Sequence, residues 1–91
     1  MKPQALNVFG KTYRIEYKPL EDLDGECHNK KSLIEIDQSL TGSNFTQTLI
    51  HEGLHALFYR LGYNQVIHHD IEELLVDQIA TFLVDNFTFE P

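Results

Sequence analysis

The sequence predicts an α+β fold in which a small antiparallel or mixed sheet packs on two main helices. The first half contains apolar and β-branched residues in runs of strand length, bounded by turn-forming residues. The second half contains two stretches in which apolar residues recur with helical spacing, separated by Gly62. The 91 residues have the length of one domain, 1–91, and contain no internal repeat or linker.

Two extended segments are expected in the first half of the chain. Residues 5–17 alternate well enough for a strand or a hairpin, with 9–11 as its turn. The stretch 20–25 is acidic and turn-like, and the run 32–37 has the β-branched content of a second strand. We therefore expect a small sheet whose last strand follows a turn region.

The first helix is expected to begin at the N-cap candidates 41–44 and to end at about Leu61. Gly62 is suited to end it, because glycine accepts the left-handed conformation that often follows a helix. At about 100° per residue, His51 and His55 lie at the margin of the apolar stripe, facing the edge of the interior. That stripe consists of Ile50, Leu54, Leu57 and Leu61.

The second helix is expected at about 70–86. Its residues are apolar around most of the circumference, which predicts a largely buried helix. It nevertheless carries Glu72, Glu73 and Asp77, and a buried carboxylate without a partner costs several kcal/mol or becomes protonated. A metal ion, or a histidine bound to one, would be such a partner. The apolar positions are Ile71, Leu74, Leu75, Val76, Ile79, Phe82, Leu83 and Val84.

Composition excludes several classes of partner. The 14 acidic and 7 basic residues give a formal net charge of −7, which argues against nucleic-acid or anionic-membrane binding. No apolar run approaches the ~20 residues of a membrane span, and the first residues lead into a strand-like segment rather than a signal peptide. The single Cys27 excludes an internal disulfide and suits a reducing cytoplasm, the expected location.

The motif His-Glu-Gly-Leu-His at 51–55 is the most specific pattern in the chain. Its spacing places His51 and His55 one turn apart on a single helix face, close enough to hold one metal ion. Glu52, beside the first histidine, can then act as general base toward a water on that metal.

This motif, together with Glu73-Leu74-Leu75-Val76-Asp77 downstream, resembles the gluzincin metallopeptidases. The length and order of the chain are similar to the small minigluzincin domains, to metallopeptidase-like proteins of phages and prophages, and to the ImmA/IrrE-type regulatory peptidases. The resemblance implies a zincin-like fold with one Zn²⁺ held by His51, His55 and Glu73, and with Asp77 orienting a ligand histidine. The metzincin extension of the motif is absent.

The resemblance also implies an activity and a substrate position. The protein would hydrolyse peptide bonds through a zinc-bound water from which Glu52 takes a proton. Glu52 would then return the proton to the leaving amine. The strand at 32–37 would be the edge strand on which a peptide or protein substrate lies by β-augmentation. Oligomeric state is left open.

The third metal ligand has several candidates in the sequence. Glu73 is favoured, because Asp77 lies four residues on and shares its helix face. With Asp70 as N-cap, however, Glu73 would also occupy the capping-box position. Glu72 has a simpler interpretation as a first-turn acid that favours the helix dipole. Histidine is common at zinc, so His68 or His69 remains an alternative.

Cys27 and His28 are interpreted as turn residues away from the metal.

Two other functional classes stay open. The domain could bind zinc as a non-catalytic structural or regulatory module, in which case Glu52 would have no role and a fourth protein ligand would close the site. It could also be a peptidase that needs a partner to complete its cleft, because the chain is too short for the further helical lobe of larger gluzincins. An exposed apolar face on the first helix would favour that version.

Overall fold

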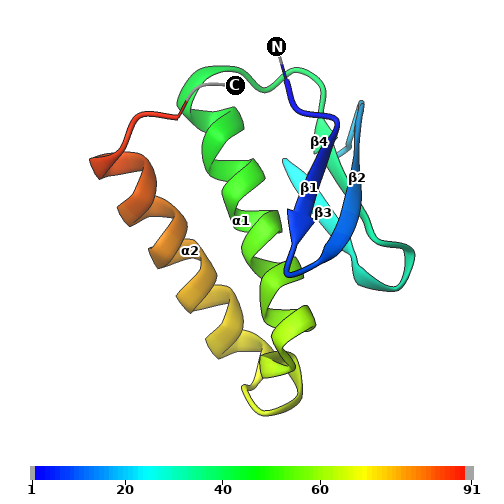
Figure 1. Cartoon of the computed structure of the whole chain (residues 1–91). Coiled ribbons are helices and arrows are strands. Elements are labelled where there is room, and N and C mark those ends of the chain that lie inside the picture. The colour runs from blue at the N-terminus through cyan, green and yellow to red at the C-terminus, as the bar shows by residue number, and fades with distance from the viewer. Residues whose placement is uncertain (1, 90–91) are drawn as a thin grey trace.

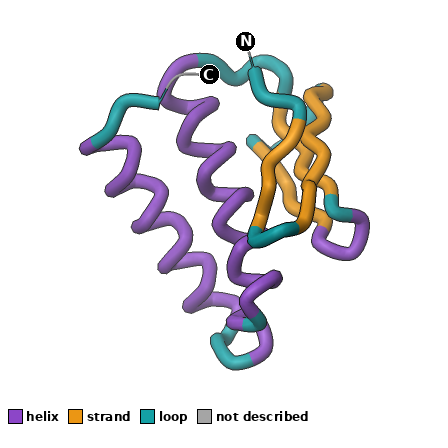
Figure 2. Tube along the Cα trace, in the orientation of Figure 1, coloured by secondary structure: helices purple, strands orange, loops and turns teal. Residues whose placement is uncertain are grey.

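A mixed sheet and two long helices make up the structure, a computed structural model that describes residues 2–89 (Figure 1). Helix α1 lies between the sheet and α2, so both helices lie on one side of the sheet (Figure 2). The predicted α+β class is therefore confirmed. The strands are β1 (Ala5–Val8), β2 (Lys11–Lys18), β3 (Gly25–His28) and β4 (Leu33–Asp37), and the helices are α1 (Gly42–Leu61) and α2 (His69–Asn86).

The sheet has four strands in the order β1-β2-β4-β3. β1 and β2 form an antiparallel hairpin, one of the two arrangements expected for residues 5–17, and its turn places Phe9 and Gly10 at φ values of 50° and 86°. β2 pairs in parallel with β4, and β3 pairs antiparallel with β4. The sheet is thus mixed, and β1 and β3 are its two edges.

The prediction that 32–37 is an edge strand is wrong. β4 lies between β2 and β3, and its residues Leu33, Ile34 and Ile36 are buried, as expected of an interior strand. The edge strand beside α1 is β3, which contains Cys27 and His28 in place of the predicted turn. β3 has only four residues, Gly-Glu-Cys-His, so it is too short and too mixed in composition to show an alternating pattern.

The main core lies between the sheet and α1. Full burial of side chains such as Ile34 and Ile36 contributes about 1.5–3 kcal/mol each. This packing fixes the position of α1 against the strands, and with it the position of the motif at 51–55. The buried cluster consists of Val8, Tyr13, Ile15, Ile34, Ile36, Phe45 and Ala56.

Helix α1 begins and ends where the sequence predicts. Thr41 is the N-cap residue in an extended conformation. Gly62 follows the helix at φ 85°, and its N–H bonds to the carbonyl groups of Phe58 and Tyr59. A side chain at this positive φ would be strained, so glycine fits the stop.

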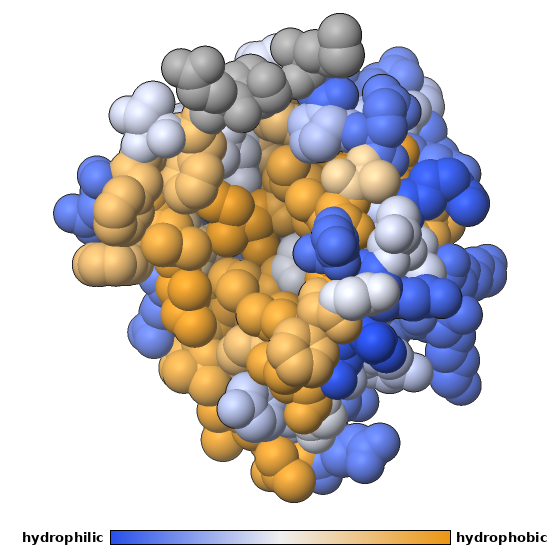
Figure 3. Space-filling view, viewed as in Figure 1, coloured by the Kyte–Doolittle hydropathy of each residue, from blue (hydrophilic) through white to orange (hydrophobic). Residues whose placement is uncertain are grey.

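Helix α2 spans the predicted residues but is not largely buried. Only Glu72, Val76 and Ala80 are buried, because α2 packs on a single neighbour, α1, through a narrow stripe spaced four residues apart. Its large apolar side chains contribute to the hydrophobic surface in Figure 3. The exposed ones are Ile71, Leu74, Leu75, Ile79 and Phe82. No helix among the described residues is long and apolar enough to cross a membrane.

Candidate metal centre

Three candidate ligands from two helices converge beside the sheet. His51 and His55 project from one face of α1, with ring centroids 4.9 Å apart, and Glu73 projects from the start of α2. Glu73 Oε1 lies 3.6 Å from His51 Nε2 and contacts His55 Nε2. One ligand atom from each of the three residues lies within 4.8 Å of the others.

The second nitrogen of each imidazole faces a carboxylate. His55 Nδ1 is hydrogen-bonded to Glu72 Oε2 at 2.6 Å, and His51 Nδ1 lies 3.9 Å from Asp77 Oδ1. The first is a short hydrogen bond, whereas the second is an ion-pair distance beyond hydrogen-bond range. Both Nε2 atoms are thereby directed toward Glu73, as ligand histidines are usually oriented in metal sites.

Glu72 is a partner that the sequence pattern did not identify. We expected Asp77 to hold a ligand histidine, but the hydrogen bond to one comes from Glu72, which is buried at 8% exposure. The signal lay in the stripe Glu72, Val76 and Ala80, whose spacing of four and small apolar members mark the face that packs on α1. Because apolar residues occur around most of the circumference of α2, the sequence pattern did not single out this face.

Glu52 lies at the same site with an unusual carboxylate environment. The residue is 8% exposed, and its carboxylate forms no hydrogen bond or ion pair with a described residue. Its oxygens open to the cleft, because no fully buried side-chain oxygen among the described residues lacks a partner. Burial raises the pKa of Glu52 to about 7. The charge of His55 lowers the value, while those of Glu73 and Glu26 raise it. A largely buried acid with a raised pKa that opens to a cleft is typical of functional sites.

These residues line a cleft of about 1080 Å³ between β3, α1 and α2. Gly25 allows β3 to approach α1 closely there. A Cβ atom at Gly25 would come within 2.8 Å of Thr48 Cγ2 and 3.1 Å of Glu52 Cγ. Any side chain at this position would therefore displace the strand or the general-base candidate.

Cys27 also lines the cleft, where its thiol is partly buried and hydrogen-bonded. It donates a hydrogen bond to Asn29 Oδ1 at 3.3 Å. Burial, together with the charges of Glu52 and Glu72, raises the pKa of Cys27 to about 12. Thiolate is the form that binds metals and attacks electrophiles, so Cys27 stays a protonated wall residue.

The structure separates the alternative third ligands. His68 is the N-cap of α2, with Nδ1 accepting a hydrogen bond from the Asp70 N–H at 3.2 Å. A capping box of Asp70 and Glu73 is therefore wrong, because the helix begins earlier than that interpretation requires. His69 lines the cleft, but it does not belong to the three-residue group described above.

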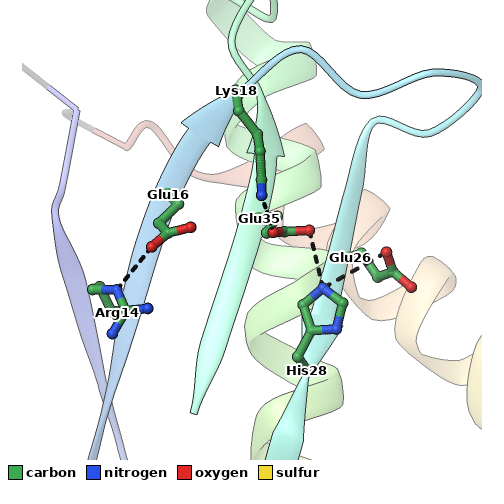
Figure 4. Close-up of polar contacts among 6 residues, drawn as sticks. All are labelled: Arg14, Glu16, Lys18, Glu26, His28 and Glu35. Carbon is green, nitrogen blue, oxygen red and sulfur yellow. Dashed lines mark hydrogen bonds and ion pairs between the residues drawn. The ribbon is translucent and has the colours of Figure 1, made fainter. Parts of the chain in front are cut away.

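A second group of histidine and carboxylates lies on the sheet. Glu26, His28 and Glu35 also bring one ligand atom each within 4.8 Å of one another (Figure 4). His28 Nε2 is 3.0 Å from Glu35 Oε1, and the other oxygen of Glu35 contacts Lys18 Nζ. The hydrogen bond from Lys18, and next that from His28, lower the pKa of Glu35.

The residues at the cleft fit a zinc ion of the catalytic type. Two imidazole nitrogens and one carboxylate oxygen are donors that zinc takes in such sites, where three protein ligands leave a position open. Zinc–ligand distances of ~2.0–2.1 Å in a tetrahedron separate neighbouring ligand atoms by ~3.3 Å. The 3.6 Å between His51 Nε2 and Glu73 Oε1 is close to that separation, whereas His55 Nε2 and Glu73 Oε1 are in direct contact and would have to move apart to admit the ion.

No family model, curated protein or solved structure matches the chain.

Proposed function

We propose that the chain is a gluzincin-like zinc metallopeptidase domain, with α1 as the active-site helix and α2 as the glutamate helix of a zincin-like fold. One observation carries the proposal: His51, His55 and Glu73 converge beside a largely buried Glu52 whose carboxylate opens to the cleft and bonds to no described residue. Metal ligands with a free carboxylate next to them are the components of metal-assisted hydrolysis.

Each residue has a defined part in peptide hydrolysis. Zinc, when bound, would lower the pKa of water and polarise the carbonyl of the scissile bond. His51, His55 and Glu73 would hold the ion, and Glu72 would fix the ring of His55. Glu52 would accept a proton from water and return it to the leaving amine.

The peptide would lie along β3 rather than along 32–37. β3 is the edge of the sheet that lines the cleft, so its outer backbone groups are the ones available to a further strand. A peptide paired with β3 would pass between the sheet and α2, beside Glu52.

A structural zinc module is the main rival. Structural zinc sites usually have four protein ligands, whereas the described residues bring three to this site. His68 instead caps α2. The unpartnered Glu52 also has no purpose in a closed site, so the geometry favours the catalytic version.

A peptidase that needs a partner to complete its cleft has less support. Among the described residues, the large apolar side chains of α1 that are clearly exposed are Tyr59 and Leu61, both in its last turn. The exposed apolar residues of α2 lie away from its cleft-lining positions, which are His69, Glu72, Glu73 and Asp77.

Metal analysis with matched variants tests the proposal. We expect near-stoichiometric zinc in the wild type and in Glu52→Gln, with cleavage of a casein or mixed-peptide substrate in the wild type alone. Glu73→Ala should lose zinc, whereas Asp85→Asn, a control on the same helix outside the cleft, should keep both properties. Full zinc retention by Glu73→Ala would refute the ligand assignment, and unchanged cleavage by Glu52→Gln would refute the mechanism.

A further inference from the structure

The cleft is lined by carboxylates and by no lysine or arginine among the described residues. Its two walls both carry acids, so a bound molecule meets negative charge on either side. The acidic residues that line it are Asp24, Glu26, Glu52, Glu72, Glu73 and Asp77.

Not all of these carboxylates are in contact with a histidine of the candidate metal centre. Glu72 and Glu73 are in contact with the imidazoles of the candidate metal centre. Asp24 has no ion pair with a described residue, and Glu26, half exposed, lies 3.7 Å from His28. Asp24 and Glu26 are therefore the acids of the β3 wall that remain accessible to a ligand.

Glu52 shows that this cleft differs from an ordinary acidic surface. As a residue it is more than nine-tenths buried, it lines the cleft, and its carboxylate bonds to no described residue. No fully buried side-chain oxygen among the described residues lacks a partner, so the Glu52 oxygens reach the open space of the cleft. A polar ligand in the cleft can therefore meet this carboxylate.

The position of the two free acids relates them to a peptide on β3. The Asp37 N–H bonds to the carbonyl of Asp24, which lies in the bend just before β3, at 2.8 Å. Glu26 is the second residue of β3, and both acids line the cleft. Asp24 and Glu26 therefore lie along the edge that a paired peptide would follow.

We propose that this cleft selects peptides with a lysine or arginine near the scissile bond, and that Asp24 and Glu26 bind its side chain. The inference rests on the proposed function, because it takes the ligand to be a peptide lying on β3. Opposite charges on a cleft and its ligand favour the right partner and repel acidic ones.

Peptide binding by a protein that does not turn over provides the test. The protein is zinc-loaded Glu52→Gln, and the readout is fluorescence anisotropy. The probes are three tetramethylrhodamine-labelled alanine nonapeptides with lysine, norleucine or glutamate at alternate positions. We expect the lysine peptide to bind about 10-fold more tightly than the norleucine peptide, with a preference that shrinks in high salt.

Two double variants in this background separate the cleft from the overall charge. Asp24→Asn with Glu26→Gln should remove the preference for lysine. Glu21→Gln with Asp22→Asn changes the net charge equally at residues that do not line the cleft, and should retain the preference. Thermal melts establish that each variant is folded. Equal loss of the preference in both double variants, or equal binding of lysine and norleucine peptides, would overturn the inference.

Wild-type cleavage of the same peptides keeps the two proposals distinct. Selective binding without any cleavage would remove the peptidase and leave the inference about the cleft standing. Cleavage with no preference for lysine would support the peptidase and overturn the inference about the cleft.

Discussion

The two histidine–carboxylate groups of this protein differ in what neutralises them. In the sheet group, Lys18 contacts Glu35, and His28 bonds to the same carboxylate (Figure 4). The cleft group of His51, His55 and Glu73 forms no ion pair with a lysine or arginine among residues 2–89. The sheet group supplies its own cation, whereas the cleft group has the donors of a metal site and no cation from the chain.

Their surroundings differ in the acid that lies beside each group. The accessible carboxylates are alike, since the side chains of Glu26 and Glu73 are 50% and 48% exposed. At the cleft, however, Glu52 and Glu72 are buried at 8% exposure, and Glu52 bonds to no described residue. A group of histidine and glutamate side chains is therefore a weak sign of a metal site. A largely buried acid that opens to the same cleft is a stronger one.

The largest expected difference between the two groups is in zinc affinity. We expect His55→Ala to weaken zinc binding more than about 100-fold, because even the loss of residues that orient ligands costs 10–100-fold. His28→Ala should leave the affinity unchanged. Competition against a fluorescent zinc chelator measures both values.

Melting temperatures provide an independent readout of the same difference. Zinc at 100 times its dissociation constant stabilises the fold by about 2.7 kcal/mol, or roughly 10–20 °C for a domain of this size. The rise should persist in His28→Ala and vanish in His55→Ala. Equal losses in the two variants would contradict the distinction between the groups.

The next effect concerns the metal-free stability of the cleft. Because burial raises the pKa of Glu52 from 4.5 to about 7, the folded protein binds more protons than the unfolded chain between these pH values. The free energy of unfolding should then fall as pH rises from about 4.5 through 7, by about 3 kcal/mol at most. Glu52→Gln should lack this fall.

Urea unfolding in the presence of a chelator, at several pH values from 4 to 9, measures the effect. Glu16→Gln is the matched control, since this exposed acid pairs with Arg14 outside the cleft. A wild-type profile parallel to that of Glu52→Gln would show that the Glu52 carboxylate is solvated or paired in solution.

The sequence predicted the local features of this protein better than the long-range ones. The bounds of α1, its stop at Gly62 and the turn of the first hairpin follow from residue types close together in the chain. Strand order does not, because a parallel pair such as β2 and β4 is joined through distant residues. The site divides in the same way. The motif on α1 fixes the two histidines, but the acid that meets His55 depends on how α2 rotates against α1.

That rotation underlies a smaller expected effect on the cleft. Glu72→Gln keeps the shape of the side chain but replaces a charged acceptor of His55 with a neutral amide. We expect zinc affinity to fall about 10-fold, near the lower end of the range for residues that orient ligands. Asp77→Asn should have less effect, because Asp77 lies 3.9 Å from His51, beyond hydrogen-bond distance. The same chelator competition ranks the two, and a larger loss in Asp77→Asn would reverse the assignment.

The smallest effect is expected where the chain supplies its own cation. Lys18→Met removes the positive charge beside Glu35 and should raise the pKa of that carboxyl, because the hydrogen bond from Lys18 is the main cause of its depression. The melting temperature should change by only a few degrees, since exposed ion pairs contribute little to stability.

Zinc titration of this variant gives the sharper readout. If Lys18 is what keeps the sheet group from binding zinc, Lys18→Met should bind a second equivalent of zinc, more weakly than the first. Adding His28→Ala to this variant should abolish the second equivalent. A variant that binds one equivalent as the wild type does would instead assign the difference to the deeper burial of the cleft histidines, since His28 is 29% exposed whereas His51 and His55 are 20% and 12% exposed.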